Sequence, residues 1–110
     1  MVCGKLEIDI LNSFWNLEND DADISIQDVV DDLSRQGIKR AYTTIKTVMD
    51  RLVAKSVLVR YKSGKKFFYK AVMSRTETIA ESVNTLLEQF FGGDCSELLR
   101  FVETECKLLV

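Results

Sequence analysis

The fold of this chain is decided by the stretch AYTTIKTVMDRL, residues 41–52. Its apolar side chains recur at positions i, i+3, i+4 and i+7, which predicts a helix with one buried face. They are Ile45, Val48, Met49 and Leu52. The opposite face carries Thr43, Thr44, Lys46, Thr47 and Arg51. These side chains can donate hydrogen bonds to base edges or phosphates. A solvated polar face of no special function is the alternative.

Positive charge is concentrated around this helix, between Arg35 and Arg75. That segment holds 12 Lys and Arg residues and one acid, Asp50, so its net charge is +11. The remaining residues include 3 basic and 16 acidic side chains, which gives −13. The net charge of −2 for the whole chain therefore hides a strongly basic middle. Such a distribution is typical of a protein that binds a polyanion.

A second helix is predicted just before this stretch, over residues 26–36. Ser25 is suited to the N-cap, and Asp28 at the third helical position completes a capping box. Gly37 can take the left-handed conformation that closes a helix. Residues 37–40 are then a short connection between two helices, as in a helix-turn-helix motif.

An earlier helix is predicted over residues 5–17 from the spacing of Ile8, Leu11 and Trp15. Phe14 and Trp15 are expected to lie in the core, because buried aromatic residues at helical spacing usually do. Stacking on nucleic-acid bases is the alternative for this pair.

A β-hairpin is predicted after the basic helix, because β-branched and aromatic residues flank a turn at Gly64. Its strands are expected at residues 58–62 and 66–71. Its candidate DNA-binding residues are Arg60, Lys62, Lys65 and Lys66. Attached to a helix-turn-helix, such a hairpin is a wing that can contact the phosphate backbone. Lysines that protect an edge strand from aggregation are the alternative, and both roles are compatible.

Two further amphipathic helices are predicted in the last third of the chain, separated by Gly92-Gly93. Ser74 and Glu77 form a capping box for the first, and Asp94 caps the second. Their apolar residues are Ile79, Val83, Leu86, Leu87, Phe90, Leu98, Val102 and Leu109. We expect residues 1–72 to form a winged-helix DNA-binding domain and residues 73–110 a helical dimerisation region. Packing of these helices against their own chain is the alternative.

Catalytic, metal-binding and membrane functions lack candidate residues. The chain has no histidine, and its three cysteines, Cys3, Cys95 and Cys106, are far apart in sequence. We expect ordinary reduced thiols, no metal site, no cofactor, no small-molecule ligand and no enzymatic activity. No run approaches the roughly 20 apolar residues that span a bilayer, and no signal peptide is recognisable. A cytoplasmic location is the default expectation.

The chain resembles the penicillinase-repressor family of bacterial winged-helix transcriptional regulators. The resemblance rests on the order of four segments and covers nearly the whole chain. They are Glu7–Trp15, Ala41–Lys55, Arg60–Tyr69 and Phe91-Gly92-Gly93-Asp94. It implies a homodimeric repressor, mostly α with a small β-hairpin, that binds a palindromic operator through its third helix and its wing.

The resemblance also implies roles for individual residues. Thr44, Lys46 and Thr47 would read the major groove, and Arg60, Lys62 and Lys65 would approach phosphates. Penicillinase repressors of the family are cleaved at an Asn-Phe bond, whereas this chain has Arg100-Phe101 nearby. The copper-responsive branch carries paired Cys-x-Cys elements, which this chain lacks. Neither inducing signal is therefore carried over.

Two functions remain at this point. The first is a sequence-specific DNA-binding regulator of transcription that acts as a repressor on a palindromic operator in double-stranded DNA. The second is a winged-helix protein-interaction module whose basic face binds an acidic partner protein. Binding to DNA should weaken steeply with salt.

Overall fold

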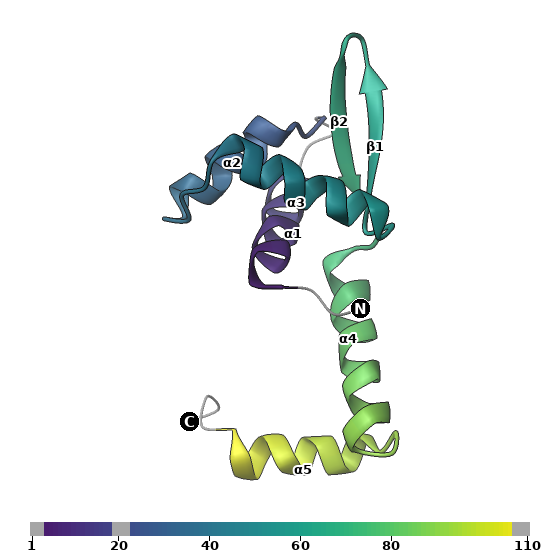
Figure 1. The fold of residues 1–110 in the computed structure, drawn as a ribbon. Coiled ribbons are helices and arrows are strands. Elements are labelled where there is room, and N and C mark those ends of the chain that lie inside the picture. Colours follow the sequence, from purple (N-terminus) through teal and green to yellow (C-terminus); the bar gives the residue numbers. More distant parts are fainter. Residues whose placement is uncertain (1–3, 19–22, 107–110) are drawn as a thin grey trace. The chain divides into compact units, whose positions relative to one another are not determined.

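In the computed structural model, which describes residues 4–18 and 23–106, the chain divides between Arg75 and Thr76 into two units. The first unit contains α1 (Lys5–Leu17), α2 (Ile26–Arg35), α3 (Tyr42–Ala54), β1 (Leu58–Ser63) and β2 (Lys66–Ala71) (Figure 1). The other helices are α4 (Arg75–Phe90) and α5 (Cys95–Glu105). The mostly α fold with one hairpin is confirmed, and so is the winged helix-turn-helix order of the first unit.

One hydrophobic core joins the three helices and the hairpin of the first unit. Its side chains are almost fully shielded from water, and burial of each contributes roughly 1.5–3 kcal/mol. The most deeply buried of them are Ile10, Phe14, Val29, Leu33, Ile45, Met49, Leu52, Leu58 and Tyr69. The buried face of α3 is the one predicted from its spacing. Ile8 of α1 is 46% exposed, because the core-facing side of that helix is centred on Ile10 and Phe14.

Phe14 and Trp15 belong to the interior of the unit, as predicted. Phe14 is fully buried, and Trp15 packs partly buried against the core. The indole Nε1–H of Trp15 donates to the carbonyl oxygen of Met73 at 3.2 Å. A buried indole usually finds such a partner. This bond ties α1 to the chain that leaves the hairpin.

Both ends of α2 use the predicted residues. The Ser25 hydroxyl accepts from the Asp28 N–H at 3.2 Å, and the Asp28 carboxylate accepts from the Ser25 N–H at 2.9 Å, which completes the capping box. Gly37 has φ +85°, and the N–H of Ile38 donates back to the carbonyl of Leu33 at 2.8 Å. These contacts stop the helix sharply and turn the chain toward α3.

The end of α3 has the same geometry without a glycine. Ser56 has φ +61°, and the N–H of Val57 donates to the carbonyl of Leu52 at 2.9 Å. A side chain at positive φ is unfavourable, so this turn is held by the packing of its neighbours. It leads directly into β1.

The hairpin is antiparallel, with a register that runs from Leu58 opposite Ala71 to Ser63 opposite Lys66. Gly64 takes the first position of its two-residue turn with φ +65°. At the other end, the N–H of Tyr69 donates to the carbonyl of Ile24 at 2.8 Å. This bridge, together with a hydrogen bond from Tyr61 to Asp23, attaches the hairpin to the segment before α2 and so places the wing beside the helix-turn-helix.

In the second unit, α4 and α5 meet at a glycine turn. Gly92 and Gly93 both have positive φ, and the N–H of Gly93 donates to the carbonyl of Leu87 at 2.9 Å. Asp94 then caps α5 by accepting from the Ser96 N–H at 2.9 Å. The predicted break and cap are both confirmed.

Candidate nucleic-acid interface

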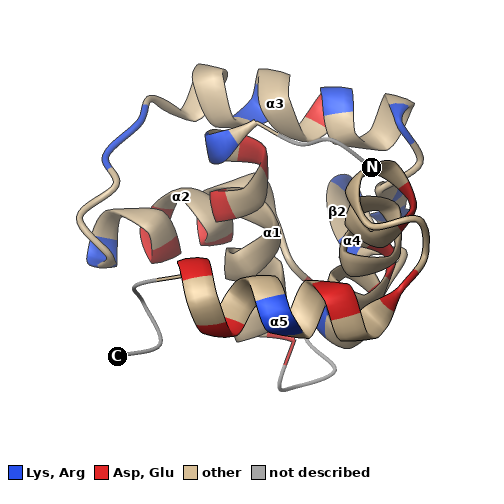
Figure 2. Ribbon diagram, turned by 90° about the horizontal axis from the view of Figure 1, so that it is seen from below, with Lys and Arg blue, Asp and Glu red and all other residues tan. Residues whose placement is uncertain are grey.

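The exposed face of α3 carries all five side chains that the sequence assigned to it: Thr43, Thr44, Lys46, Thr47 and Arg51. Basic residues continue along the connection between α2 and α3, whereas most of the charged side chains of α2 and α5 are acidic (Figure 2). The core residues of α3 hold its other face in place. One face of α3 therefore presents polar and basic side chains to solvent.

Thr47 has limited freedom to donate a hydrogen bond. Its hydroxyl donates to the carbonyl oxygen of Thr43, one turn earlier, at 2.9 Å. Its oxygen lone pairs and its methyl group stay available on the exposed face. Thr47 is thus suited to accept from a base amino group or to contact a thymine methyl group.

Lys46 is held by an acid on its own helix. Its Nζ donates to Asp50 Oδ2 at 2.8 Å, and Arg60 of β1 lies 3.9 Å from Asp50 Oδ1. The hydrogen bond with the Asp50 carboxylate raises the pKa of Lys46 above its ordinary value, and their charge attraction adds to this. Lys46 and Arg60, which are far apart in sequence, are therefore brought together by one carboxylate.

Tyr69 lies beside this cluster and is 2% exposed. Burial raises the pKa of Tyr69, and the negative charge of Asp50 raises it further, while Arg60 opposes both effects. The hydroxyl is consequently a neutral donor at physiological pH. The sequence did not identify Tyr69 as a site residue, because its place over α3 depends on the bridge to Ile24.

Arg51 also lies near a buried acid of α1. Glu7 is 7% exposed and accepts from Lys55 Nζ at 3.0 and 3.2 Å, and the Arg51 guanidinium lies 3.9 Å from the same carboxylate. The Arg51 side chain still keeps 55% of its surface exposed. Glu7 therefore fixes the C-terminal half of α3 on α1. The sequence offered no signal for this pairing, since it joins residues more than 40 positions apart.

The hairpin exposes Arg60, Lys62, Lys65 and Lys66, as predicted. An additional residue, Phe67, supports two of these cations. The guanidinium carbon of Arg60 lies 4.7 Å from the centroid of the Phe67 ring, and Lys62 Nζ lies 5.8 Å from it. Cation–π contacts of this kind orient basic side chains that would otherwise be mobile. Half of the Phe67 surface is exposed.

The other face of the hairpin contacts an acid. The Tyr61 hydroxyl donates to Asp23, and this hydrogen bond raises the pKa of Tyr61. Tyr61 also packs against Phe68 at a centroid distance of 6.2 Å. Arg60 and Tyr69 are paired neighbours on the opposite face. The two faces of the wing thus have different neighbours, Asp23 on one and Asp50 on the other.

The residues assigned to dimerisation differ in exposure. Ile79, Val83, Leu86 and Phe90 are exposed, with Phe90 at 74%. Leu98 and Val102 are half-buried, Leu87 is 6% exposed, and Leu109 lies outside the described residues. Leu99 and Phe101 of α5, which are 62% and 47% exposed, were not among the residues assigned to dimerisation. Phe101 packs edge-to-face on Phe91 at 5.7 Å.

Metal-binding clusters and membrane-spanning helices are absent from residues 4–18 and 23–106. This part of the chain holds no group of three or more Cys, Asp and Glu side chains that could bind a metal ion. No helix in it has the length and apolarity to cross a bilayer. Cys95 is exposed and Cys106 half-buried, and both are free thiols.

Comparison with known proteins identifies the family to which this chain belongs. The penicillinase repressor family matches residues 3–109. The chain belongs to the penicillinase repressor family. It is 27% identical over 100 residues to the penicillinase repressor of Staphylococcus aureus, covering 90% of this chain and 75% of that protein. The resemblance inferred from the sequence is confirmed.

A solved structure supports the fold of this repressor-family chain. The ferric uptake regulator of Francisella tularensis, solved with iron, aligns with a TM-score of 0.55 and 18% identity. The alignment covers 82% of this chain and 80% of that one. At this identity the similarity concerns the fold alone. Membership of the penicillinase repressor family makes the chain a DNA-binding regulator of transcription and not an enzyme.

Proposed function

We propose that the protein is a repressor that binds a palindromic operator in double-stranded DNA as a homodimer, and that it acts in the cytoplasm. In this proposal α3 lies in the major groove, where Thr43, Thr44, Lys46 and Thr47 contact base edges. Arg51 and the basic residues of the hairpin contact phosphates.

The observation that carries the proposal is the exposed face of α3. A helix of 13 residues, anchored by its buried face, presents threonine and lysine side chains beside a basic hairpin. These side chains can make both base and phosphate contacts. Membership of the penicillinase repressor family points to the same activity.

Dimerisation is supported by the second unit. Exposed Ile79, Val83, Leu86 and Phe90 give α4 more apolar surface than a monomer in water favours. A symmetric pair of such helices would bury this surface and hold two α3 helices at a fixed separation. For half-sites one helical turn apart that separation is about 34 Å.

Selection of bound duplexes from a random pool tests this proposal. We expect enrichment of an inverted repeat, bound by two chains, with an affinity that falls steeply as salt increases. Recovery of duplexes with no common sequence would contradict the proposal. Recovery of a single site without an inverted repeat would also contradict it. If duplex DNA is not bound at all, an acidic partner protein becomes the better candidate for the basic face.

A further inference from the structure

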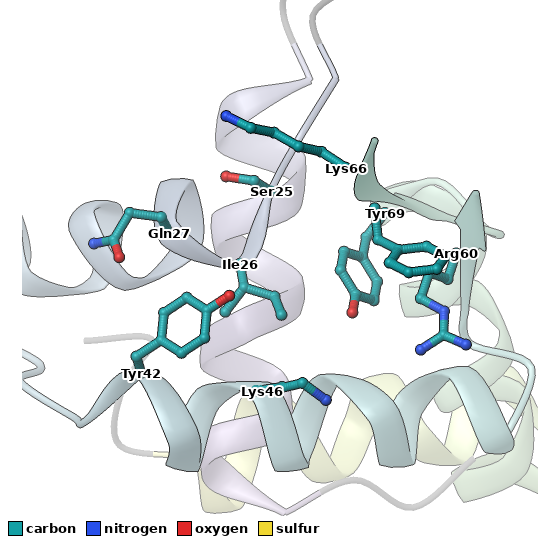
Figure 3. A pocket seen from close by; sticks show the side chains of 9 residues that line it. Ser25, Ile26, Gln27, Tyr42, Lys46, Arg60, Lys66 and Tyr69 are labelled. Carbon is teal, nitrogen blue, oxygen red and sulfur yellow. The ribbon is translucent and has the colours of Figure 1, made fainter. Parts of the chain in front are cut away.

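A hollow of 490 Å³ opens between α3, the beginning of α2 and the hairpin (Figure 3). Its apolar base includes Ile26 and Tyr69, which are 7% and 2% exposed. Lys46 and Lys66 lie on opposite sides of it, and Arg60 lines it from β1. All of these residues belong to the first unit, so the hollow is built within a single body.

The lining of the hollow is basic. It contains three cations and no carboxylate. Asp50 is close by and contacts Lys46 and Arg60 at 2.8 and 3.9 Å. No carboxylate of the described residues lies within salt-bridge distance of Lys66. The cations therefore outnumber the neighbouring acid, and the site favours an anion.

The hollow also suits the shape of a phosphate ester. Its volume lies within the roughly 300–1,000 Å³ of sites that hold a small ligand, so it can take a phosphate together with an attached sugar or ring. The Tyr69 hydroxyl and the charged ends of Lys46 and Arg60 point into the same part of it (Figure 3). Tyr42 contributes a second ring and hydroxyl from the first turn of α3.

We propose that this hollow binds a phosphate group, and that the bound phosphate draws Lys46 and Arg60 away from Asp50. The phosphate group comes either from the DNA backbone or from a free phosphorylated ligand. The first source rests on the proposed function. Both sources present the same chemistry to the site. Because Lys46 is also the proposed base contact of α3, a phosphate held in the hollow competes with base edges for this side chain.

The first experiment uses the intact chain without DNA. Inorganic phosphate is titrated at constant ionic strength, balanced with sodium chloride, while the side-chain nitrogen resonances of Lys46 and Arg60 are followed by NMR. We expect saturable shifts, and at least a roughly fivefold weaker response for Lys66→Ala, since one charged donor is removed. Lys70→Ala is the matched control. It removes an exposed lysine from the same strand that does not line the hollow, and should behave as the wild type.

The second experiment locates the source. Neutral methylphosphonates are placed one at a time along a bound duplex. We expect one position in each half-site to weaken wild-type binding about tenfold, as for loss of a charge-assisted hydrogen bond, and to weaken binding by Lys66→Ala by a clearly smaller factor. If phosphate saturates the site but no DNA position is coupled to Lys66, the ligand is a free phosphate ester.

The outcomes separate this inference from the proposed function. A chain that binds operator DNA, yet shows neither saturable phosphate shifts nor a coupled position, overturns the inference alone. A chain that saturates with phosphate but binds no DNA retains the phosphate site and contradicts the proposed function.

Discussion

Lys46 and Asp50 lie one turn apart on α3, and their side chains form a hydrogen-bonded ion pair with Nζ 2.8 Å from Oδ2. Asp50 is the one acid between Arg35 and Arg75. Its Oδ1 is buried, has no hydrogen-bond partner in the described part of the chain, and faces Arg60 at 3.9 Å. Asp50 therefore restrains two cations of the basic surface.

Asp50→Asn should increase binding to DNA of any sequence. Removing one negative charge close to the phosphates is worth on the order of 1 kcal/mol, which corresponds to about a fivefold gain in affinity for random duplexes. Discrimination should fall, because Lys46 and Arg60 are no longer held in one geometry. Fluorescence titration on specific and random duplexes measures both effects. Asp9→Asn, on α1, is the control. Unchanged or weaker binding of Asp50→Asn to random duplexes would contradict the proposed role of Asp50.

Glu7→Gln should destabilise the first unit. Glu7 is buried while its partners Lys55 and Arg51 remain about half exposed, so they can return to water when the charge is lost. We therefore expect a loss of about 1 kcal/mol in the free energy of unfolding. Urea denaturation measures this loss.

Asp9→Asn again provides the comparison for the Glu7 variant. Asp9 pairs with Lys5, whose side chain is 88% exposed, and its loss should change stability little. Equal effects of the two substitutions would show that Glu7 has no special role in joining α1 to α3.

Ser56→Gly should stabilise the protein. Ser56 closes α3 at φ +61°, a conformation that costs a residue with a Cβ roughly 1 kcal/mol. Glycine removes most of this cost, partly offset by the greater freedom of the unfolded chain. Thermal unfolding should show a higher Tm for Ser56→Gly and a lower one for Ser63→Gly, which places glycine in a strand. A lower Tm for Ser56→Gly would mean that its side chain stabilises the turn.

Phe90→Asp should dissociate the proposed dimer. Burial of one Phe side chain contributes about 1.5–3 kcal/mol and a symmetric interface contains it twice, so the dimer Kd should rise roughly 100-fold or more. Sedimentation of the intact variant measures this, with Gln89→Asp as the control of equal charge at the neighbouring exposed position. A wild-type chain that sediments as a monomer at micromolar concentration would exclude the dimer.

Local features of the fold could be predicted from the sequence because each has a local cause. The buried face of α3 follows from spacing, and the start of α2 follows from Ser25 and Asp28. Gly37 and Gly64 mark turns because positive φ favours glycine. The end of α3 had no such signal, since Ser56 occupies that conformation.

Contacts between distant segments could not be predicted. The bridge of Tyr69 to Ile24 involves one residue pair and leaves no periodic pattern. Consequently neither the hollow nor the contact of Arg60 with Asp50 was predicted, although both charged residues were noted in the sequence. Glu7 was missed because this acid of α1 and its partner Lys55, just after α3, lie far apart in the sequence.

The measurement that tests base recognition by α3 most directly compares Lys46→Ala with Lys65→Ala on specific and random duplexes at two salt concentrations. Lys46→Ala should lose about 1–3 kcal/mol on the specific duplex and relax discrimination at one base pair of each half-site. Lys65→Ala should weaken binding to all duplexes alike and reduce the salt slope by about one. If both variants lose affinity equally on specific and random DNA, Lys46 does not read bases and the proposed placement of α3 in the major groove is wrong.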